Sequence, residues 1–288
     1  MVRDSDISVL IVTFNNRGFI RGCLESVAQA GDGENWKVIV VDNGSDDGSA
    51  DVAMEYTNVQ VIRKGRNAGF AAGVNSGLDI VDSEYLLLLN PDTVVTGDSI
   101  QTLKGYLDAN AEVACVAPQL LNFDGSIQSS CREFPTLKTI LAEFFLLPGV
   151  RRRFPKLDKY RMGYFDHRSE REVDQPMASC VLLRKGVLDE IGRLDERLPI
   201  FFNDVDLCRR IKNKGWSIVF LPDAKVYHYY GASTKALGTD RQLHLARSMY
   251  RYLRKHEPGI LVYLCGLFLI VGYLLKSVYS MMFETRRG

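Results

Sequence analysis

The sequence lacks the cysteine pairs, the excess charge and the N-terminal leader that mark several classes of protein. Its six cysteines are scattered with no C-x-x-C pair, so they suggest neither a zinc site nor a disulfide framework, and a reducing compartment fits them best. The 36 basic and 35 acidic residues nearly cancel, which argues against a nucleic-acid-binding protein that relies on a strong positive field. Residues 1–6 are polar and acidic and lead directly into an apolar run, so we expect neither a signal peptide nor export.

Apolar runs alternate with amphipathic segments through the first part of the chain. With 288 residues, 46% of them hydrophobic, the chain can form one large domain or a domain with an appended segment. Periodicity predicts strands at 7–13, 36–41, 59–64 and 86–89, separated by helices that begin near 17, 49 and 71. This alternation predicts βαβ units with right-handed crossovers. The expected fold class is therefore α/β, with a doubly wound, mainly parallel, Rossmann-like sheet and helices on both faces.

The most apolar of these runs, Leu86–Leu89, leads into a turn sequence that ends in an acid. A short, wholly apolar run predicts a strand buried on both faces, and Pro91 ends it. Asp92 then follows the carboxyl end of the strand, where open α/β sheets bind their ligands. Asn90, Pro91 and Asp92 also favour turns for local reasons, so a plain turn is the alternative interpretation.

Polar residues follow the other expected strands in the same way. They lie at Thr13–Asn15, at Asp42–Ser45 and in the segment that holds Gly69 and Asn75. Because the carboxyl ends of parallel strands meet at one edge of a sheet, these residues should converge with Asp92. Several polar strand ends in succession favour a ligand site over a set of unrelated turns.

The second half of the chain adds two acids on a helix and a histidine after a strand. A helix is expected from Asn203 or Asp204 to about residue 214, and Asp204 should share its apolar face, which is turned toward the core and cleft. Asp206 points the other way and can pair with Arg209 or Arg210. Capping could explain Asp204, and ion pairing could explain Asp206. His228 follows an expected strand at 225–227, where a lone histidine is more often structural than a ligand.

The C-terminal region changes character. An amphipathic helix rich in arginine precedes residues 260–283, which are apolar except for Lys276, a few small polar residues and glycines. This length meets the roughly 20 residues that a bilayer span requires. A buried helix pair and a re-entrant segment are alternatives, but the segment shows little of a polar face, so we expect membrane association. A basic stretch at 151–156 predicts a solvated loop first, and contact with an anionic acceptor or lipid headgroups second.

Seven stretches together resemble the inverting nucleotide-sugar glycosyltransferases of family 2, which have the GT-A fold, and among them the rhamnosyltransferase-like branch. They span residues 7–233 in the family's order and at its usual spacing. The stretches are ISVLIVTFNN, VIVVDNGSDDGS, NAGFAAGVNSG, YLLLLNPD, DGSIQSS, FFNDVDLCRR and AKVYHYYGAS. The resemblance implies that a nucleoside-diphosphate sugar lies across the strand ends and that an acceptor hydroxyl displaces the diphosphate.

The resemblance also implies a role for each matching residue. Donor-binding residues would be Thr13, Asn15, Asp42, Asn67, Gly69, Asn75, Asn90 and Asp92. Asp92 would hold a divalent cation, Mg²⁺ or Mn²⁺, with His228 completing that site, because a cation stabilises the charge of the leaving diphosphate. Asp204 matches the general base that removes the acceptor proton. Asp206 and Arg209 would contact the acceptor. Asn90 stands where the family's D-x-D has its first acid, and Asn203 stands where an acidic pair usually begins with Glu.

The expected protein is thus an inverting glycosyltransferase of cell-surface polysaccharide synthesis. Residues 1–118 would bind the nucleotide sugar, 119–240 would form the acceptor-binding and catalytic half, and 241–288 would hold the amphipathic helix and membrane segment. The resemblance favours dTDP-rhamnose as donor over UDP- or GDP-sugars, and a glycan or lipid-linked acceptor. A catalytic domain that uses cytosolic donors would lie at the cytoplasmic face of the membrane.

Two other classes stay open from the residues alone. A sugar-phosphate nucleotidyltransferase also uses an α/β sheet and Mg²⁺, but it should carry a Gly-rich, basic loop after the first strand. Here that strand leads into Thr13-Phe14-Asn15-Asn16. A non-catalytic nucleotide-sugar-binding protein is the second alternative.

Overall fold

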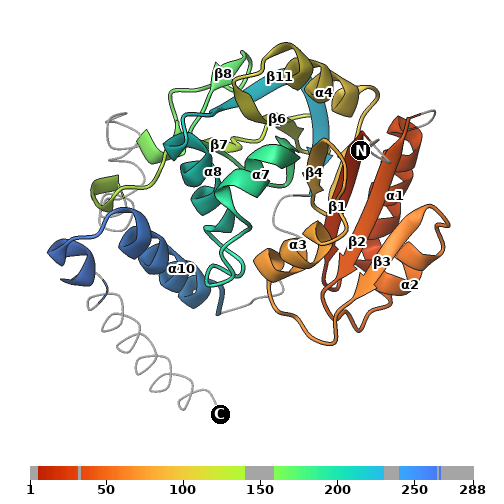
Figure 1. The fold of residues 1–288 in the computed structure, drawn as a ribbon, viewed down its shortest axis with the longest axis horizontal. Helices are drawn as coiled ribbons and strands as arrows, with labels where there is room; N and C mark the ends of the chain where they lie inside the picture. Colours follow the sequence, from red (N-terminus) through yellow and green to blue (C-terminus); the bar gives the residue numbers. More distant parts are fainter. Residues whose placement is uncertain (1–5, 32–33, 140–158, 230–239, 265, 267–288) are drawn as a thin grey trace.

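A single large sheet organises the chain. The computed structural model describes residues 6–31, 34–139, 159–229, 240–264 and 266. Nine strands form the sheet, in the order β3-β2-β1-β4-β10-β6-β11-β5, with β8 paired to the side of β11. A separate two-stranded sheet joins β7 (Cys131–Arg132) and β9 (Gln175–Pro176). Figure 1 shows helices on both sides of the main sheet.

The first half of the sheet is parallel. Its strands are β1 (Ile7–Thr13), β2 (Trp36–Asp42), β3 (Val59–Arg63) and β4 (Tyr85–Leu89). The helices between them are α1 (Arg17–Ala30), α2 (Ser49–Met54) and α3 (Phe70–Leu78). β1 pairs in parallel with both β2 and β4, and all five residues of β4 are buried. The apolar run at Leu86–Leu89 therefore forms the doubly covered strand that its composition predicts.

The second half of the sheet is mixed. It contains β5 (Thr93–Val95), β6 (Val113–Leu121), β8 (Arg171–Glu172), β10 (Cys180–Arg184) and β11 (Ser217–His228). β6 and β11 are parallel, but β10 is antiparallel to both of its neighbours, β4 and β6. β5 is antiparallel to β11. The expectation of a mainly parallel sheet thus holds for its first four strands, while β10 joins the two halves in the opposite direction.

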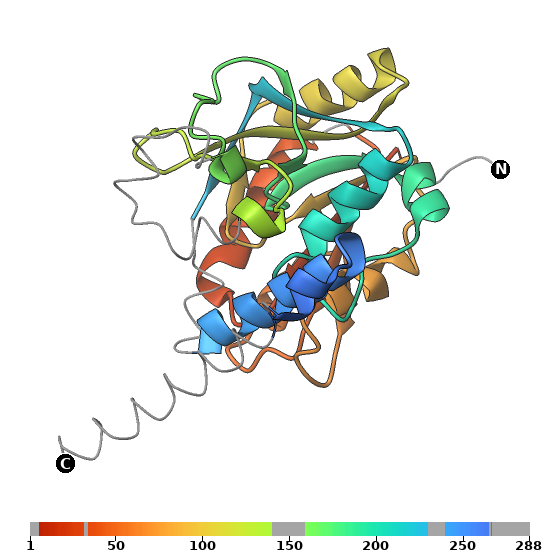
Figure 2. The ribbon, with the colours of Figure 1, turned by 90° about the vertical axis from the view of Figure 1, so that its left-hand side faces the viewer.

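Two apolar cores cover the two faces of the sheet. The helices of this second half are α4 (Ser99–Ala109), α7 (Lys185–Ile191), α8 (Asn203–Asn213) and α10 (Asp240–His256), with a short 3-10 helix, η2 (Lys159–Arg161). One core contains buried residues of α1, α2 and α4, and the other those of α3, α7, α8 and α10. Figure 2 shows α10 beside α8. Because β10 lies between β4 and β6, the two expected halves, 1–118 and 119–240, share one sheet.

The C-terminal apolar segment lies mostly outside the described residues. Among the residues that the structure describes, no helix has both the length and the apolar character needed to cross a bilayer. Of the described part, Val262 is buried, whereas Ile260 is 74% exposed. The basic stretch at 151–156 and residues 230–233 of the last motif also lie outside the described residues.

Candidate active site

The ends of β1 and β2 bring two buried polar side chains together. Thr13 and Asp42 are register partners in the parallel pair, and the Asn43 amide donates to the Thr13 carbonyl at 2.8 Å. Both side chains are almost wholly buried. Within the described residues, Thr13 Oγ1 and Asp42 Oδ1 have no hydrogen-bond partner. Buried polar atoms without partners cost free energy, so a site that keeps two of them at a sheet edge is suited to a polar ligand.

Asn15 braces the loops around this pair. Its φ of 53° places it in the left-handed region, which Asn tolerates better than most residues. Its amide donates to Ser45 Oγ at 3.0 Å, and its Oδ1 accepts from the Asp46 amide at 3.0 Å. The loops after β1 and β2 are therefore tied together at the point where the sequence predicts a donor contact.

The loop before α3 is held by a side-chain amide cluster. Asn43 Nδ2 donates to Asn67 Oδ1 at 2.9 Å and to the Gly69 carbonyl at 3.1 Å. Gly69 has a φ of 90°, and a Cβ at this position would lie 2.6 Å from the Cβ of Pro199. Only glycine fits this close approach, which explains why the loop that faces the strand ends carries it.

Asn75, which the resemblance places among the donor-binding residues, hydrogen-bonds another segment of the protein. Its Nδ2 donates to the Leu194 carbonyl at 2.9 Å and to Glu196 Oε1 at 2.8 Å, and its Oδ1 accepts from the Leu194 amide at 3.0 Å. The buried amide is occupied by the segment after α7. Asn75 therefore fixes that segment on α3 instead of offering its amide to the donor.

Asp92 and His228 meet at the centre of the sheet edge. Both are buried, and His228 Nε2 lies 3.6 Å from Asp92 Oδ1. The antiparallel pairing of β5 with β11 sets Thr93 opposite His228, and the Tyr229 amide donates to the Asp92 carbonyl at 2.9 Å. Two residues separated by more than a hundred positions are thus brought together by a strand of only three residues.

Gln128 orients the His228 ring. Its Oε1 lies 2.9 Å from His228 Nδ1, and its Nε2 donates to the His228 carbonyl at 2.7 Å. This arrangement assigns the proton to Nδ1 and leaves the Nε2 lone pair toward Asp92. Burial lowers the pKa of His228, and the nearby carboxylate opposes that shift only in part. A neutral imidazole nitrogen beside a carboxylate is a donor set that suits a divalent cation.

The described residues contain no group of three or more His, Cys, Asp or Glu side chains placed to bind a metal ion. Asp92 and His228 are the side chains that would hold a divalent cation, whose preferred ligands include carboxylate oxygens. Asn90 anchors the turn instead: its amide donates to the Ser179 carbonyl at 2.8 Å, and Nδ2 donates to Ser179 Oγ at 3.3 Å.

Asp204 lies in the first turn of α8, after Phe202, whose φ of 67° turns the chain sharply into the helix. Its Oδ1 accepts from the Val205 amide at 2.9 Å, and its Oδ2 accepts from Gln175 Nε2 at 3.3 Å. Part of its surface stays open. Burial raises the pKa of Asp204 above its usual value, although these hydrogen bonds oppose the shift. A carboxylate with a raised pKa and an open edge can accept a proton.

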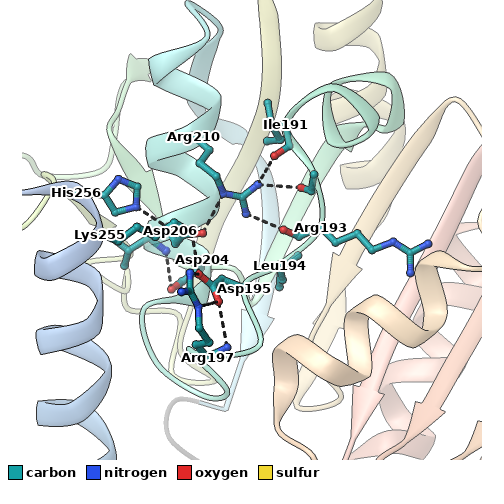
Figure 3. A network of polar contacts seen from close by, with 12 residues as sticks. Ile191, Arg193, Leu194, Asp195, Arg197, Asp204, Asp206, Arg210, Lys255 and His256 are labelled. Atoms are coloured by element: carbon teal, nitrogen blue, oxygen red, sulfur yellow. Dashed lines mark hydrogen bonds and ion pairs between the residues drawn. The ribbon is translucent and has the colours of Figure 1, made fainter.

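Asp206 has a structural role instead of the expected contact with an acceptor. The carboxylate has no exposed surface and meets Arg210 Nε at 2.9 Å, Lys255 Nζ at 2.7 Å and His256 Nε2 at 2.7 Å. Figure 3 shows these groups converging from α8 and α10. The pairing with Arg210 is the one that helical spacing predicts. Lys255 and His256 lie on α10, about fifty residues away in the chain, and the sequence gives no signal that they pair with Asp206.

Arg209 lies on α8, and Gln175 of β9 contacts that helix at Asp204. The Arg209 guanidinium lies 4.9 Å from the centre of the Phe134 ring, a cation–π contact. Gln175, which hydrogen-bonds Asp204, was not among the residues predicted from the sequence. Nor was Gln128, although it lies within the DGSIQSS stretch. Both are neutral amides, and their roles become visible only once β9 and β11 are placed.

The chain is similar in sequence to known glycosyltransferases. Residues 8–191 match the family model described as Glycosyl transferase family 2. The N-acetylglucosaminyl-diphospho-decaprenol L-rhamnosyltransferase of Mycobacterium tuberculosis is 29% identical over 274 residues, which cover 88% of this chain and 85% of that protein. The dTDP-rhamnosyl transferase RfbF of Shigella flexneri is 24% identical over 277 residues, covering 90% and 83%.

A solved structure shares the fold. The mannosyltransferase PcManGT from Pyrobaculum calidifontis, in complex with GDP-Man and Mn²⁺, aligns with a TM-score of 0.58 at 15% identity, covering 88% of this chain and 65% of that one. At this identity the likeness concerns the fold alone.

Proposed function

The chain belongs to glycosyl transferase family 2 and is a glycosyltransferase, and from this premise we propose that it transfers rhamnose from dTDP-rhamnose to a hydroxyl of a lipid-linked glycan, with inversion at the anomeric carbon. The family membership favours a glycosyltransferase over the two classes that the residues alone left open, a sugar-phosphate nucleotidyltransferase and a non-catalytic nucleotide-sugar-binding protein. The observation that carries the proposal is the meeting of Asp92 with His228 at the sheet edge, beside the buried pair Thr13 and Asp42. The names of the two rhamnosyltransferases support the choice of sugar and of acceptor.

The nucleotide end of the donor lies against β1 and β2. Thr13 Oγ1 and Asp42 Oδ1, which lack partners within the described residues, hydrogen-bond the base and ribose. The loop of Asn67 and Gly69, held by Asn43, forms the wall beside them. Binding thus supplies the hydrogen bonds that folding leaves unmade at this edge.

Asp92 and His228 are the residues that would hold a divalent cation. When bound, Mg²⁺ or Mn²⁺ supplies positive charge that stabilises the diphosphate as it leaves. Gln128 fixes the His228 ring so that Nε2 faces Asp92, and the Tyr229 amide holds the Asp92 backbone in place. The likeness to a fold crystallised with GDP-Man and Mn²⁺ supports this assignment without identifying the ion.

Asp204 acts as the base. The acceptor oxygen forms a bond to the anomeric carbon, the bond between that carbon and the diphosphate oxygen breaks, and the acceptor proton passes to the Asp204 carboxylate. The raised pKa of Asp204 makes it a stronger proton acceptor than an ordinary aspartate. Displacement from the face opposite the diphosphate inverts the configuration.

We propose that the acceptor is lipid-linked and that the protein acts at a membrane. A lipid-linked acceptor is held at a membrane, and residues 260–283 have the composition of a membrane-associating segment. We place the enzyme at the cytoplasmic face, where nucleotide sugars are made. Fractionation tests this: the full chain should sediment with membranes, and a chain that ends before Gly259 should not. Equal sedimentation of both would contradict it.

Transfer assays test the proposed reaction. The purified chain is incubated with dTDP-rhamnose, UDP-sugars or GDP-sugars, with an N-acetylglucosaminyl-diphospho-lipid acceptor, and with Mg²⁺, Mn²⁺ or a chelator. We expect a rhamnosylated product of inverted configuration from dTDP-rhamnose, and its loss with the chelator. Transfer from another donor alone would refute the assigned sugar, and a retained configuration would refute the role of Asp204.

A further inference from the structure

Four aromatic side chains gather next to Asp92 at the carboxyl end of β11. Phe123 and Tyr229 stack with ring centres 3.9 Å apart and planes 25° apart. Tyr227 lies 5.3 Å from Phe123, and Phe19 lies 5.0 Å from Tyr229. These rings come from α1, from the turn after β6 and from the end of β11. We call Phe19, Phe123, Tyr227 and Tyr229 the aromatic platform.

Two rings of the aromatic platform are exposed, the other two are half-buried, and none belongs to either core. Phe123 is 48% exposed and Tyr229 is 43% exposed. Neither apolar core of the sheet includes any of the four residues. A contiguous cluster of aromatic rings that belongs to neither core and has two exposed members is typical of a binding surface.

Hydrogen bonds fix the aromatic platform relative to the reaction centre. The Tyr229 amide donates to the Asp92 carbonyl at 2.9 Å, and Gln128 Nε2 donates to the His228 carbonyl at 2.7 Å and to Asn122 Oδ1 at 2.8 Å. The turn that carries Phe123 and the strand end that carries Tyr229 are therefore tied to Asp92 and His228. A ligand on the rings would lie at a defined distance from the metal-binding pair.

The surroundings of the rings indicate the kind of ligand. The rim of the platform is polar, with Asn122, Asp124 and Ser126 in the same turn, and both Asp124 and Ser126 are exposed. Exposed aromatic surface next to polar groups matches a pyranose, whose C–H groups line its faces and whose hydroxyls lie at its edge. The acidic Asp124 disfavours an anionic lipid headgroup at this position.

The place of the platform in the sheet separates it from the nucleotide. Among the described residues, Thr13 Oγ1 and Asp42 Oδ1 lack hydrogen-bond partners, and they lie at the ends of β1 and β2. Phe123, Tyr227 and Tyr229 follow β6 or end β11, strands that lie on the other side of β4 in the strand order, and Phe19 alone comes from α1, after β1. A sugar on the platform therefore need not compete with the base and ribose.

We propose that the aromatic platform binds a pyranose ring of the acceptor glycan by stacking, an inference that rests on the proposed function of the same site. Losing one ring of a stacked pair removes the stacking energy but no group that touches the donor. Removal of the exposed Phe123 ring should raise the acceptor KM roughly five- to tenfold and leave the donor KM and kcat at saturating acceptor unchanged.

Direct binding tests the inference without requiring turnover. Saturation-transfer NMR on the full chain uses methyl N-acetyl-β-glucosaminide and methyl α-rhamnoside as probes. We expect ring-proton signals from at least one probe, reduced at least fivefold in Phe123→Ala and in Tyr229→Ala, and retained in Phe123→Tyr and Tyr229→Phe. Excess dTDP should leave these signals in place. Met54→Ala, a change at a 58% exposed side chain of α2, is the control for a general surface effect.

Three results would overturn the inference: no signal from either probe, equal signals in the alanine variants, or displacement by dTDP. The last would mean that the rings bind the donor base. Thermal unfolding confirms that each variant is folded. Failure of the proposed function looks different, because it would show as absent transfer by the unaltered chain in the donor assay, whatever the NMR signals.

Discussion

Replacing Asp206 by asparagine removes the charge that joins α8 to α10. The carboxylate is fully buried and contacts three cationic or hydrogen-bonding groups, on Arg210, Lys255 and His256 (Figure 3). Removing one partner of a buried ion pair costs about 3–5 kcal/mol, because the remaining charge stays desolvated.

The structure sets the expected loss at the lower end of that range. Lys255 keeps a second carboxylate, Asp195, at 2.9 Å, and its side chain is 31% exposed. Arg210 keeps hydrogen bonds to the carbonyls of residues 191, 192 and 193. We therefore expect Asp206→Asn to lower the free energy of unfolding by about 3 kcal/mol. For a chain of this size, that corresponds to a fall in Tm of about 5 °C.

A matched control isolates the effect of burial. Asp189 pairs with Lys185 at the same helical spacing as Asp206 with Arg210, but its side chain is 64% exposed. Asp189→Asn should cost no more than about 0.5 kcal/mol. Chemical denaturation of both variants and the unaltered chain gives the comparison. An equal loss in the two variants would refute the reasoning.

The pH dependence gives a second check on Asp206. Burial alone would raise the pKa of this carboxyl, but the bonds from His256 and Lys255 and the charge of Arg210 lower it. A carboxyl with a depressed pKa in the folded state contributes stability above its unfolded pKa of about 3.9, and the contribution is lost as the pH falls through the folded value. The stability gap between Asp206→Asn and the unaltered chain should therefore be full at pH 7 and shrink below about pH 4. A gap that widens on acidification would contradict the sign.

Two further predictions concern the donor loop and the base. Gly69→Ala should lose about 1–3 kcal/mol of stability and weaken dTDP binding, because φ is positive and the new Cβ would meet Pro199. Gly65→Ala, where a Cβ would meet open space, should change neither stability nor dTDP binding. Equal effects of the two substitutions in thermal shift and dTDP titration would contradict this prediction. The raised pKa of Asp204 means that the base loses its carboxylate form as the pH falls through a value above 3.8, so kcat should decline on the acid side with a midpoint above 3.8. A midpoint at or below that value, in a pH profile at saturating substrates, would argue against Asp204 as the titrating group.

The strands of the first half and the acids that follow them could be predicted from the sequence because their signals are local. Leu86–Leu89 is apolar throughout, and such a run has few alternatives to a buried strand. Asp42 and Asp92 come directly after such runs, so the topology of a parallel sheet suffices to place them at one edge.

The parts that could not be predicted depend on contacts between distant segments. β5 has three residues and no periodicity, yet its pairing with β11 is what sets His228 beside Asp92. Asn75 looks like a donor contact in the sequence, but the segment after α7 takes up its amide. Asp206 likewise acquires Lys255 and His256 only when α10 packs against α8.

The rate of transfer by Asp204→Asn tests the central claim most directly. The amide keeps the shape of the side chain but cannot take the proton of the acceptor hydroxyl. The substitution also removes a carboxylate whose raised pKa costs stability at neutral pH, so the variant should be folded and no less stable than the unaltered chain. We expect donor binding, measured by thermal shift with dTDP, to stay unchanged while kcat falls by about 10²–10⁴. Undiminished transfer by a folded Asp204→Asn would contradict the account.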